Sequence, residues 1–276
     1  MIRDITLGQY YQTDSIVHRL DPRVKIAATL VFICSLFVVE QAAGYIVAVL
    51  FLAFAIRLSH VPFRFMMRGM RAILFLLLIT FFFNLFLTPG EAVFHIWKLS
   101  VTKEGISLAV KMAVRLSLLI IGSSVMTLTT TPNNLTDGLE KMLRPLQKCK
   151  VPVHEVAMMM SIALRFIPIL LEETDKIMKA QMARGASFDE GNLIQKAKSM
   201  VPLLVPLFIS AFRRANDLAM AMEARCYRGG EGRTKMKPLQ YKKRDYVAYL
   251  VLAAYLAVCI VVGRIMSWGS ILNFQP

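Results

Sequence analysis

Long apolar runs separated by short polar stretches make up most of this chain of 276 residues. The hydrocarbon core of a bilayer is about 30 Å thick, and a helix needs roughly 20 mainly apolar residues to cross it. By that measure the sequence predicts about five spanning helices, the second being the shortest: 24–40, 43–57, 71–88, 106–129 and 246–263. We therefore expect an all-α integral membrane protein.

A different pattern fills the segment between the fourth and fifth apolar runs. Helix-start residues after Thr129–Pro132 predict a short helix that ends near Pro145. Two long helices should follow, from near Val153 to Arg184 and from near Gln195 to about Gly230, each apolar in its first half and rich in charged or small residues in its second. Kinks or breaks are expected in both, because prolines interrupt them: Pro168, Pro202 and Pro206.

These patterns divide the chain into three parts. Residues 1–130 should form an N-terminal membrane domain with four spans. Residues 131–230 should form a domain of long crossing helices, and residues 231–276 a linker followed by a C-terminal transmembrane helix.

The two long helices end in related sequences that lie 41 residues apart. The first reads Ala-Gln-Met-Ala-Arg-Gly over 180–185, and the second reads Ala-Met-Glu-Ala-Arg-Cys over 221–226. At the same offset a pair of acids in the first helix aligns with a pair of bases in the second: Glu172 and Glu173, Arg213 and Arg214. Opposite charges at matching positions predict that the two helices sit against each other.

The repeated arginines, Arg184 and Arg225, have two interpretations. A cation at a helix C-terminus is stabilised by the helix dipole by about 0.3–1 kcal/mol, which explains one such residue without any partner. A pair in a repeated context favours docking, because small neighbours leave each guanidinium open to bidentate contact with a carboxylate or with backbone carbonyls of another protein.

Composition and charge place the chain in a bilayer with a defined orientation. Its hydrophobic share is 56%, above the 45–50% or so of soluble domains. The loop 57–71 carries arginines and no acid, whereas the connection 89–105 balances its charges, so the first is expected in the cytoplasm and the second outside. The N-terminus and residues 131–245 then lie in the cytoplasm. The net charge of +15 fits positive loops and anionic lipid, and no nucleic-acid motif accompanies it.

Catalytic and metal chemistry find little support. The chain has no Gly-Lys-Ser or Gly-Lys-Thr phosphate loop, so we expect it to bind no ATP itself and not to be an enzyme. Its histidines lack His-Glu-x-x-His spacing and its cysteines form no Cys-x-x-Cys pair, which predicts no metal site and free thiols. A stand-alone secondary transporter or channel stays open as an alternative, although the spans hold few ionisable residues.

Several short motifs together resemble the transmembrane T component of energy-coupling factor (ECF) transporters over essentially the whole chain. They are Gly8-Gln9-Tyr10, Leu20 to Lys25, Thr130-Thr131-Pro132 with Leu135 to Leu139, and the two Ala-Arg helix ends. The resemblance implies an ABC-type importer of the bacterial plasma membrane. In such an importer, the T component couples two ATP-binding cassette ATPases, which bind ATP and Mg²⁺, to a substrate-binding S component that usually carries a vitamin.

The resemblance also assigns roles to residues. Residues 131–230 become a coupling-helix domain on the cytoplasmic side. The motifs Ala183-Arg184-Gly185 and Ala224-Arg225-Cys226 would dock into grooves of the two ATPases, and apolar faces over 158–169 and 203–209 would hold the S component. Cys226 departs from the glycine of the commoner pattern, which leaves Arg225 in place but leaves the form of the second turn open.

Overall fold

The computed structural model describes residues 10–39, 41–89, 92–96, 99–186, 188, 192–230, 236 and 238–272. The chain divides into two compact units, each considered by itself. We call them the membrane unit, within residues 8–138 and 239–276, and the long-helix unit, within residues 139–238. Gly8 and Gln9 of the first motif lie outside the described residues.

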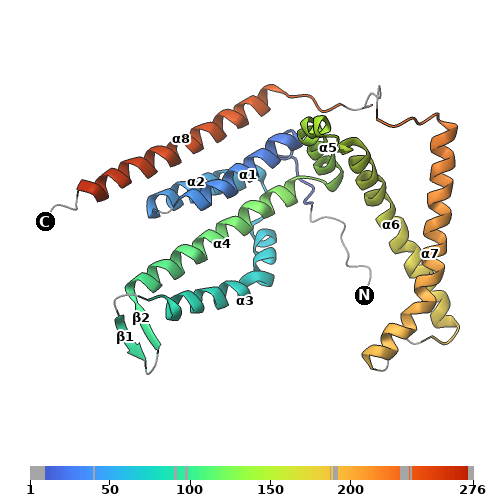
Figure 1. Ribbon diagram of the computed structural model, residues 1–276, viewed down its shortest axis with the longest axis horizontal. Helices are drawn as coiled ribbons and strands as arrows, with labels where there is room; N and C mark the ends of the chain where they lie inside the picture. The colour runs from blue at the N-terminus through green and yellow to red at the C-terminus, as the bar shows by residue number, and fades with distance from the viewer. Residues whose placement is uncertain are drawn as a thin grey trace. The chain divides into compact units, whose positions relative to one another are not determined.

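Five helices make up most of the membrane unit: α1 (Pro22–Val38), α2 (Ala42–Ser59), α3 (Phe63–Leu87), α4 (Lys103–Thr129) and α8 (Lys243–Leu272). Helix α4 packs against α1, α2 and α3, while α8 packs against α1 and α2 (Figure 1). At the centre of the core the ring of Phe51 stacks on Tyr255 with centroids 4.3 Å apart and on Phe32 at 6.0 Å. Gly122 of α4 makes this close packing possible, because a Cβ there would lie 2.7 Å from Cε1 of Phe32.

Four described helices are long and apolar enough to cross a membrane: α2, α4, α6 (Val153–Ala183) and the Lys243–Arg264 part of α8. Three of them coincide with predicted spans, which confirms an all-α membrane protein. The first predicted span is α1, whose 17 residues lie at the short end of the spanning range. The third is α3, whose apolar part is Ile73–Leu87. Helix α6 also reaches the required length and hydropathy, although the sequence pattern assigned it to the coupling-helix domain.

A short antiparallel hairpin connects α3 to α4. Its strands are β1 (Ala92–Ile96) and β2 (Leu99–Thr102), and Ile96 pairs with Leu99 next to the turn. The sequence pattern predicted only a connection there. At its end the Thr102 hydroxyl accepts a hydrogen bond from the backbone N–H of Gly105 at 3.0 Å, which caps α4.

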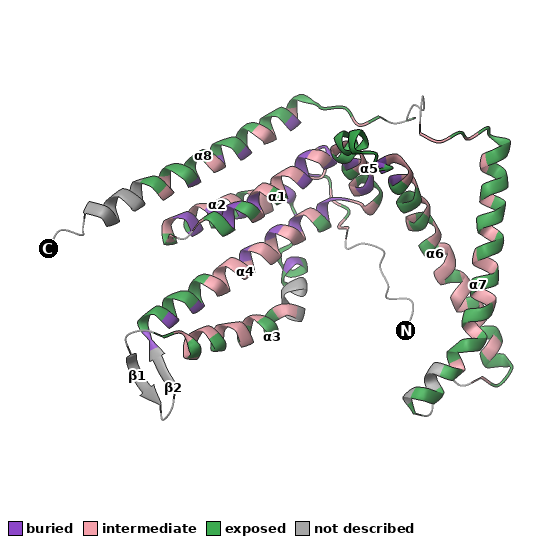
Figure 2. Ribbon diagram, in the orientation of Figure 1, coloured by how far each residue is buried: buried purple, intermediate pink, exposed green. Residues whose placement is uncertain are grey.

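The long-helix unit begins within α5 (Pro132–Leu143), which crosses the boundary between the two units, and continues through the 3₁₀ helix η2 (Arg144–Cys149), α6 and α7 (Leu193–Ala224). The predicted boundaries of α5 and α6 agree with these to within two residues, whereas α7 ends at Ala224, six residues before its predicted end at about Gly230. Helices α6 and α7 pack on each other and cross (Figure 1). Most residues of both helices are exposed or intermediate in burial (Figure 2). The exposed residues include large apolar ones.

The internal prolines do not break the long helices. Helix α6 is continuous through Pro168, and α7 is continuous through Pro202 and Pro206. Helix α7 bends partway along its length (Figure 1). The expected breaks are therefore absent, and the bend agrees with the kink that a missing N–H and a crowded ring produce in a helix that tertiary contacts hold together.

Candidate docking site at two helix ends

The first Ala-Arg motif closes α6 with a Schellman turn. The N–H of Gly185 donates to the carbonyl of Met182, and the N–H of Ala186 donates to the carbonyl of Gln181, each at 3.0 Å. This bond pattern needs a left-handed residue just after the helix, and Gly185 supplies it with φ +86°. Arg184 is the C-cap residue, with φ −89° and ψ 7°.

The second motif closes α7 with the same turn. The N–H of Cys226 donates to the carbonyl of Glu223 at 2.8 Å, and the N–H of Tyr227 donates to the carbonyl of Met222 at 3.0 Å. Cys226 adopts φ +56°, so it takes the left-handed position that Gly185 takes in α6. Arg225 is the C-cap with φ −91° and ψ 11°. The replacement of glycine by cysteine therefore leaves the form of the turn unchanged.

Both helix ends are exposed. All six motif residues lie at the surface: Ala183, Arg184, Gly185, Ala224, Arg225 and Cys226. Among the described residues, none forms an ion pair or side-chain hydrogen bond with Arg184 or Arg225. The small neighbours and the shared turn give each guanidinium the same free position at the tip of a long helix. Their docking role stays a prediction.

An ion pair joins the two long helices where they cross. Nη2 of Arg214 donates to Oε2 of Glu173 at 2.8 Å, and both side chains are partly buried. Arg184 lies 11 residues after Glu173, and Arg225 lies 11 residues after Arg214. At 1.5 Å per residue, each arginine is about 16 Å along its own helix from the ion pair. Glu172 and Arg213, the other members of the predicted set, are exposed.

A second contact shows that the crossing is antiparallel. Nε2 of Gln181 donates to the carbonyl of Pro202 at 3.4 Å. That carbonyl has no partner within α7, because the residue four positions later is Pro206, which lacks an N–H. The two contacts occur in opposite order along the two helices. Glu173 precedes Gln181 in α6, whereas its partner Arg214 follows Pro202 in α7. The two arginine tips therefore lie on opposite sides of the crossing.

The segment after the second motif packs back onto the start of α6. Gly230 leaves no room for a Cβ against the imidazole ring of His154. Nδ1 of His154 lies 2.9 Å from Oε1 of Glu140, which ties α6 to α5. The backbone at Gly230, five residues after Arg225, therefore lies against the start of α6.

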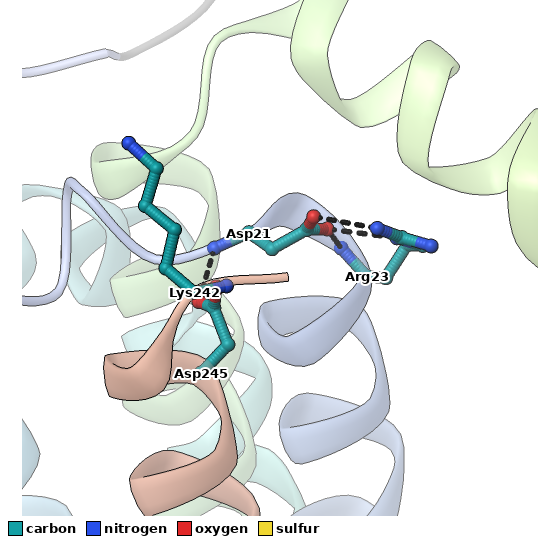
Figure 3. Close-up of polar contacts among 4 residues, drawn as sticks. All are labelled: Asp21, Arg23, Lys242 and Asp245. Carbon is teal, nitrogen blue, oxygen red and sulfur yellow. Dashed lines mark hydrogen bonds and ion pairs between the residues drawn. The ribbon is translucent and has the colours of Figure 1, made fainter. Parts of the chain in front are cut away.

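The membrane unit contains a polar junction that sequence reasoning did not assign to a site. Asp21 caps α1, and its carboxylate accepts hydrogen bonds from the backbone N–H, Nε and Nη2 of Arg23 at 2.8–3.0 Å (Figure 3). Asp245 is buried in the first turn of α8, and its carboxylate accepts from the backbone N–H groups of Asp21 at 2.9 Å and Lys242 at 2.7 Å. The guanidinium of Arg23 also stacks over the ring of Tyr241 at 3.8 Å. One carboxylate therefore ties together two segments that are 224 positions apart.

Two of the motifs behind the family resemblance, Leu20 to Lys25 and the segment that contains Gly138, come together beside this junction. Gly138 allows α5 to approach α1 closely, because a Cβ there would lie 2.9 Å from Cβ of Pro22. Nζ of Lys25 donates to the carbonyls of Thr129 at 2.8 Å and His18 at 3.1 Å, which satisfies a carbonyl at the C-terminus of α4. The signal that could have pointed to Asp245 is a lone acid at the start of an apolar helix.

Comparisons with known proteins agree with this architecture. The family model described as cobalt transport protein (CbiQ) matches residues 13–236. A relative from Clostridium kluyveri, named energy-coupling factor transporter transmembrane protein EcfT, is 56% identical over 272 residues, which are 98% of this chain and 100% of the relative. Proteins of the same name from Thermosediminibacter oceani and Bacillus subtilis are 52% and 46% identical, covering 96% and 93% of this chain and 98% of each relative.

The apolar helices and these matches define the class as a multi-pass, all-α membrane component of a transporter. Within that class the chain belongs to the family of transmembrane T components of energy-coupling factor transporters.

Proposed function

We propose that the chain is the coupling subunit of an ABC-type importer, linking two ATP-binding cassette ATPases to a substrate-binding S component that takes up a vitamin or other micronutrient. The single observation that carries the proposal is the repeated, exposed Schellman turn at the tips of α6 and α7, each with an arginine that has no ion pair or side-chain hydrogen bond among the described residues. In this proposal ATP and Mg²⁺ bind to the ATPases, and hydrolysis belongs to them.

The proposed mechanism is mechanical. Closure of the ATPases on ATP would move their grooves, and each groove would carry one helix tip with it. Arg184 and Arg225 stand about 16 Å from the ion pair on opposite sides of an antiparallel crossing. Movement of the tips would therefore rotate α6 and α7 about their crossing, because the Glu173–Arg214 ion pair holds them together there.

The S component would bind the apolar surface of the same two helices. Large apolar side chains are exposed along both: Met159, Met160, Ile167, Leu204, Phe208, Ile209 and Phe212. A surface of this kind marks an interaction site with protein or membrane. Methionines are adaptable in packing, which suits a partner that is exchanged. A change in the crossing of α6 and α7 would then reach the S component directly.

Substitution of the two arginines tests the proposal. We expect Arg184→Glu with Arg225→Glu to abolish co-purification of the ATPases and ATP-driven uptake, while membrane insertion stays normal. Arg144→Glu with Arg228→Glu is the matched control, since both residues are exposed arginines outside the motifs and outside the apolar faces. Wild-type assembly and transport in the motif variant would refute the proposal. So would uptake by liposomes that contain this chain alone, which a stand-alone transporter predicts.

A further inference from the structure

An elongated apolar cavity of about 340 Å³ lies in the membrane unit between α1, α2, α4 and α8. Along α8 its lining extends from Arg244 to Leu252, about 12 Å of helix. Phe54 and Val247 belong to the lining and are also more than half exposed, so the cavity opens at the surface of the helix bundle. Its volume falls in the range of small-molecule sites, about 300–1,000 Å³.

The two charged residues of the lining, Lys25 and Arg244, are both cations and stand at the same end of the cavity. Phe32, Phe51 and Leu252 line the opposite end. Nζ of Lys25 is held by two carbonyl oxygens, which are neutral, so its charge is not cancelled by these contacts. Within the described part of the chain, no carboxylate forms an ion pair with either cation.

Arg244 has a donor without an acceptor. Its Nε is buried and has no hydrogen-bond partner among the described residues. The nearest acids in sequence are already engaged, because Asp21 accepts from Arg23 and Asp245 accepts from two backbone N–H groups. A buried donor that lacks a partner is costly, so an acceptor within reach of the Arg244 guanidinium would stabilise it.

We propose that this cavity binds an anionic phospholipid, with the headgroup phosphate between Lys25 and Arg244 and an acyl chain along the apolar lining. Charge complementarity selects the headgroup, since both charged residues of the lining are cations and a guanidinium can donate to a phosphate through two N–H groups. The cations lie near the starts of α1 and α8, where spanning helices meet the headgroup layer, and basic residues at that level attract anionic lipid. The site goes beyond the coupling function and needs no partner subunit.

Lipid titration of the purified full chain tests the site. The delipidated protein in detergent is titrated with dioleoyl phosphatidylglycerol or dioleoyl phosphatidylcholine and analysed by native mass spectrometry. We expect phosphatidylglycerol to bind several-fold more tightly than phosphatidylcholine. Arg244→Gln should weaken its binding about fivefold, the effect of one basic residue near the headgroup, with no change for phosphatidylcholine. Lys243→Gln removes an exposed cation of the same helix outside the lining and should leave binding unchanged.

A second pair of variants tests the acyl-chain part. Ala55 lines the cavity, whereas Ala53 on the same helix is exposed and does not. Ala55→Leu should weaken phosphatidylglycerol binding severalfold, and Ala53→Leu should not. Equal binding of the two lipids, equal effects of Arg244→Gln and Lys243→Gln, or equal effects of the two alanine variants would each overturn the proposal. Displacement of the lipid by equimolar glycerol phosphate would overturn it too, because the site would then recognise phosphate without an acyl chain.

Discussion

Cys226 holds a left-handed backbone conformation at the end of α7 without being glycine. A Cβ makes that conformation costlier by about 1–2 kcal/mol. We therefore expect Cys226→Gly to raise the free energy of unfolding by about 1 kcal/mol, and Gly185→Ala to lower it by a similar amount. Denaturant titration of the purified protein in detergent, followed by circular dichroism, measures both changes.

Two features isolate the backbone as the cause. No atom of the described residues lies within 4 Å of a Cβ placed on Gly185, so the expected cost of Gly185→Ala comes from φ and not from crowding. Cys226→Ala keeps a Cβ and removes only the thiol, and it should change the stability little. Equal stabilisation by Cys226→Ala and Cys226→Gly would show that the thiol sets the cost and would contradict the prediction.

Asp21 makes the polar junction of the membrane unit dependent on pH. Burial raises the pKa of its carboxyl, but the hydrogen bonds and charge of Arg23 outweigh burial and hold that pKa below its usual range. Because the folded-state pKa lies below the unfolded value of about 3.9, ionised Asp21 stabilises the fold at neutral pH. That contribution is lost as the pH falls through the folded-state pKa. Asp21→Asn should lower the thermal midpoint at neutral pH and lose less on acidification than the wild type. Parallel pH profiles would contradict this.

The crossing of α6 and α7 rests partly on one ion pair, which a charge swap can measure. Glu173→Arg and Arg214→Glu should each destabilise the protein, and the double swap should recover about 0.5–1 kcal/mol of coupling, as expected for a partly exposed pair. A double-mutant cycle by denaturant titration gives this value.

The neighbouring charges provide the control for that cycle. Glu172 and Arg213 are exposed and form no ion pair with a described residue, so Glu172→Arg with Arg213→Glu should show no coupling. A swap at 173 and 214 that fails to rescue its single reversals would remove the ion pair from the proposed mechanism.

The long helices could be predicted from local sequence because their boundaries depend on local signals. Gly185 is a local signal for the end of α6, because glycine favours the left-handed position after a helix, whereas Cys226 is not such a signal and left the form of the second turn open. The continuity of α7 through Pro202 and Pro206 could not be predicted in this way. Gln181 of α6 donates to the carbonyl of Pro202, which Pro206 leaves without an N–H partner. This contact joins two different helices, so the local sequence of α7 does not reveal it.

The polar junction was missed for the same physical reason. Asp245 acts on Asp21 across 224 positions, and the choice of Glu173 over Glu172 depends on how two helices rotate about their axes. Periodicity gives the face of a helix but not the partner that the face meets. Hydropathy alone also does not decide which helices span the membrane. Helix α6 is apolar and long enough to span although it was assigned to the coupling-helix domain, and α1 is short for a span.

At the scale of the whole molecule, the long-helix unit is predicted to lie on the cytoplasmic side, and its own thiols can test this. Cys149 and Cys226 are both exposed and both belong to the long-helix unit. In a protein where Cys34 and Cys259 are replaced by serine, a membrane-impermeant maleimide should label inside-out vesicles and leave intact cells unlabelled. The physical reason is the excess of arginines over acids in residues 57–71, around the connection between α2 and α3, which predicts that this end of both helices lies in the cytoplasm and that α4 ends on the same side.

The controls make the orientation test decisive. Replacement of Cys149 and Cys226 by serine as well should abolish the signal from inside-out vesicles, and permeabilised cells should give full labelling of the two-thiol protein. Labelling of Cys226 alone in intact cells would place the tip of α7 outside the cell, where no ATPase could reach Arg225. Labelling of both thiols in intact cells would show that the topology is the inverse of the predicted one. Either result would remove the basis for coupling through α6 and α7, whereas cytoplasmic labelling of both is what two docked ATPases require.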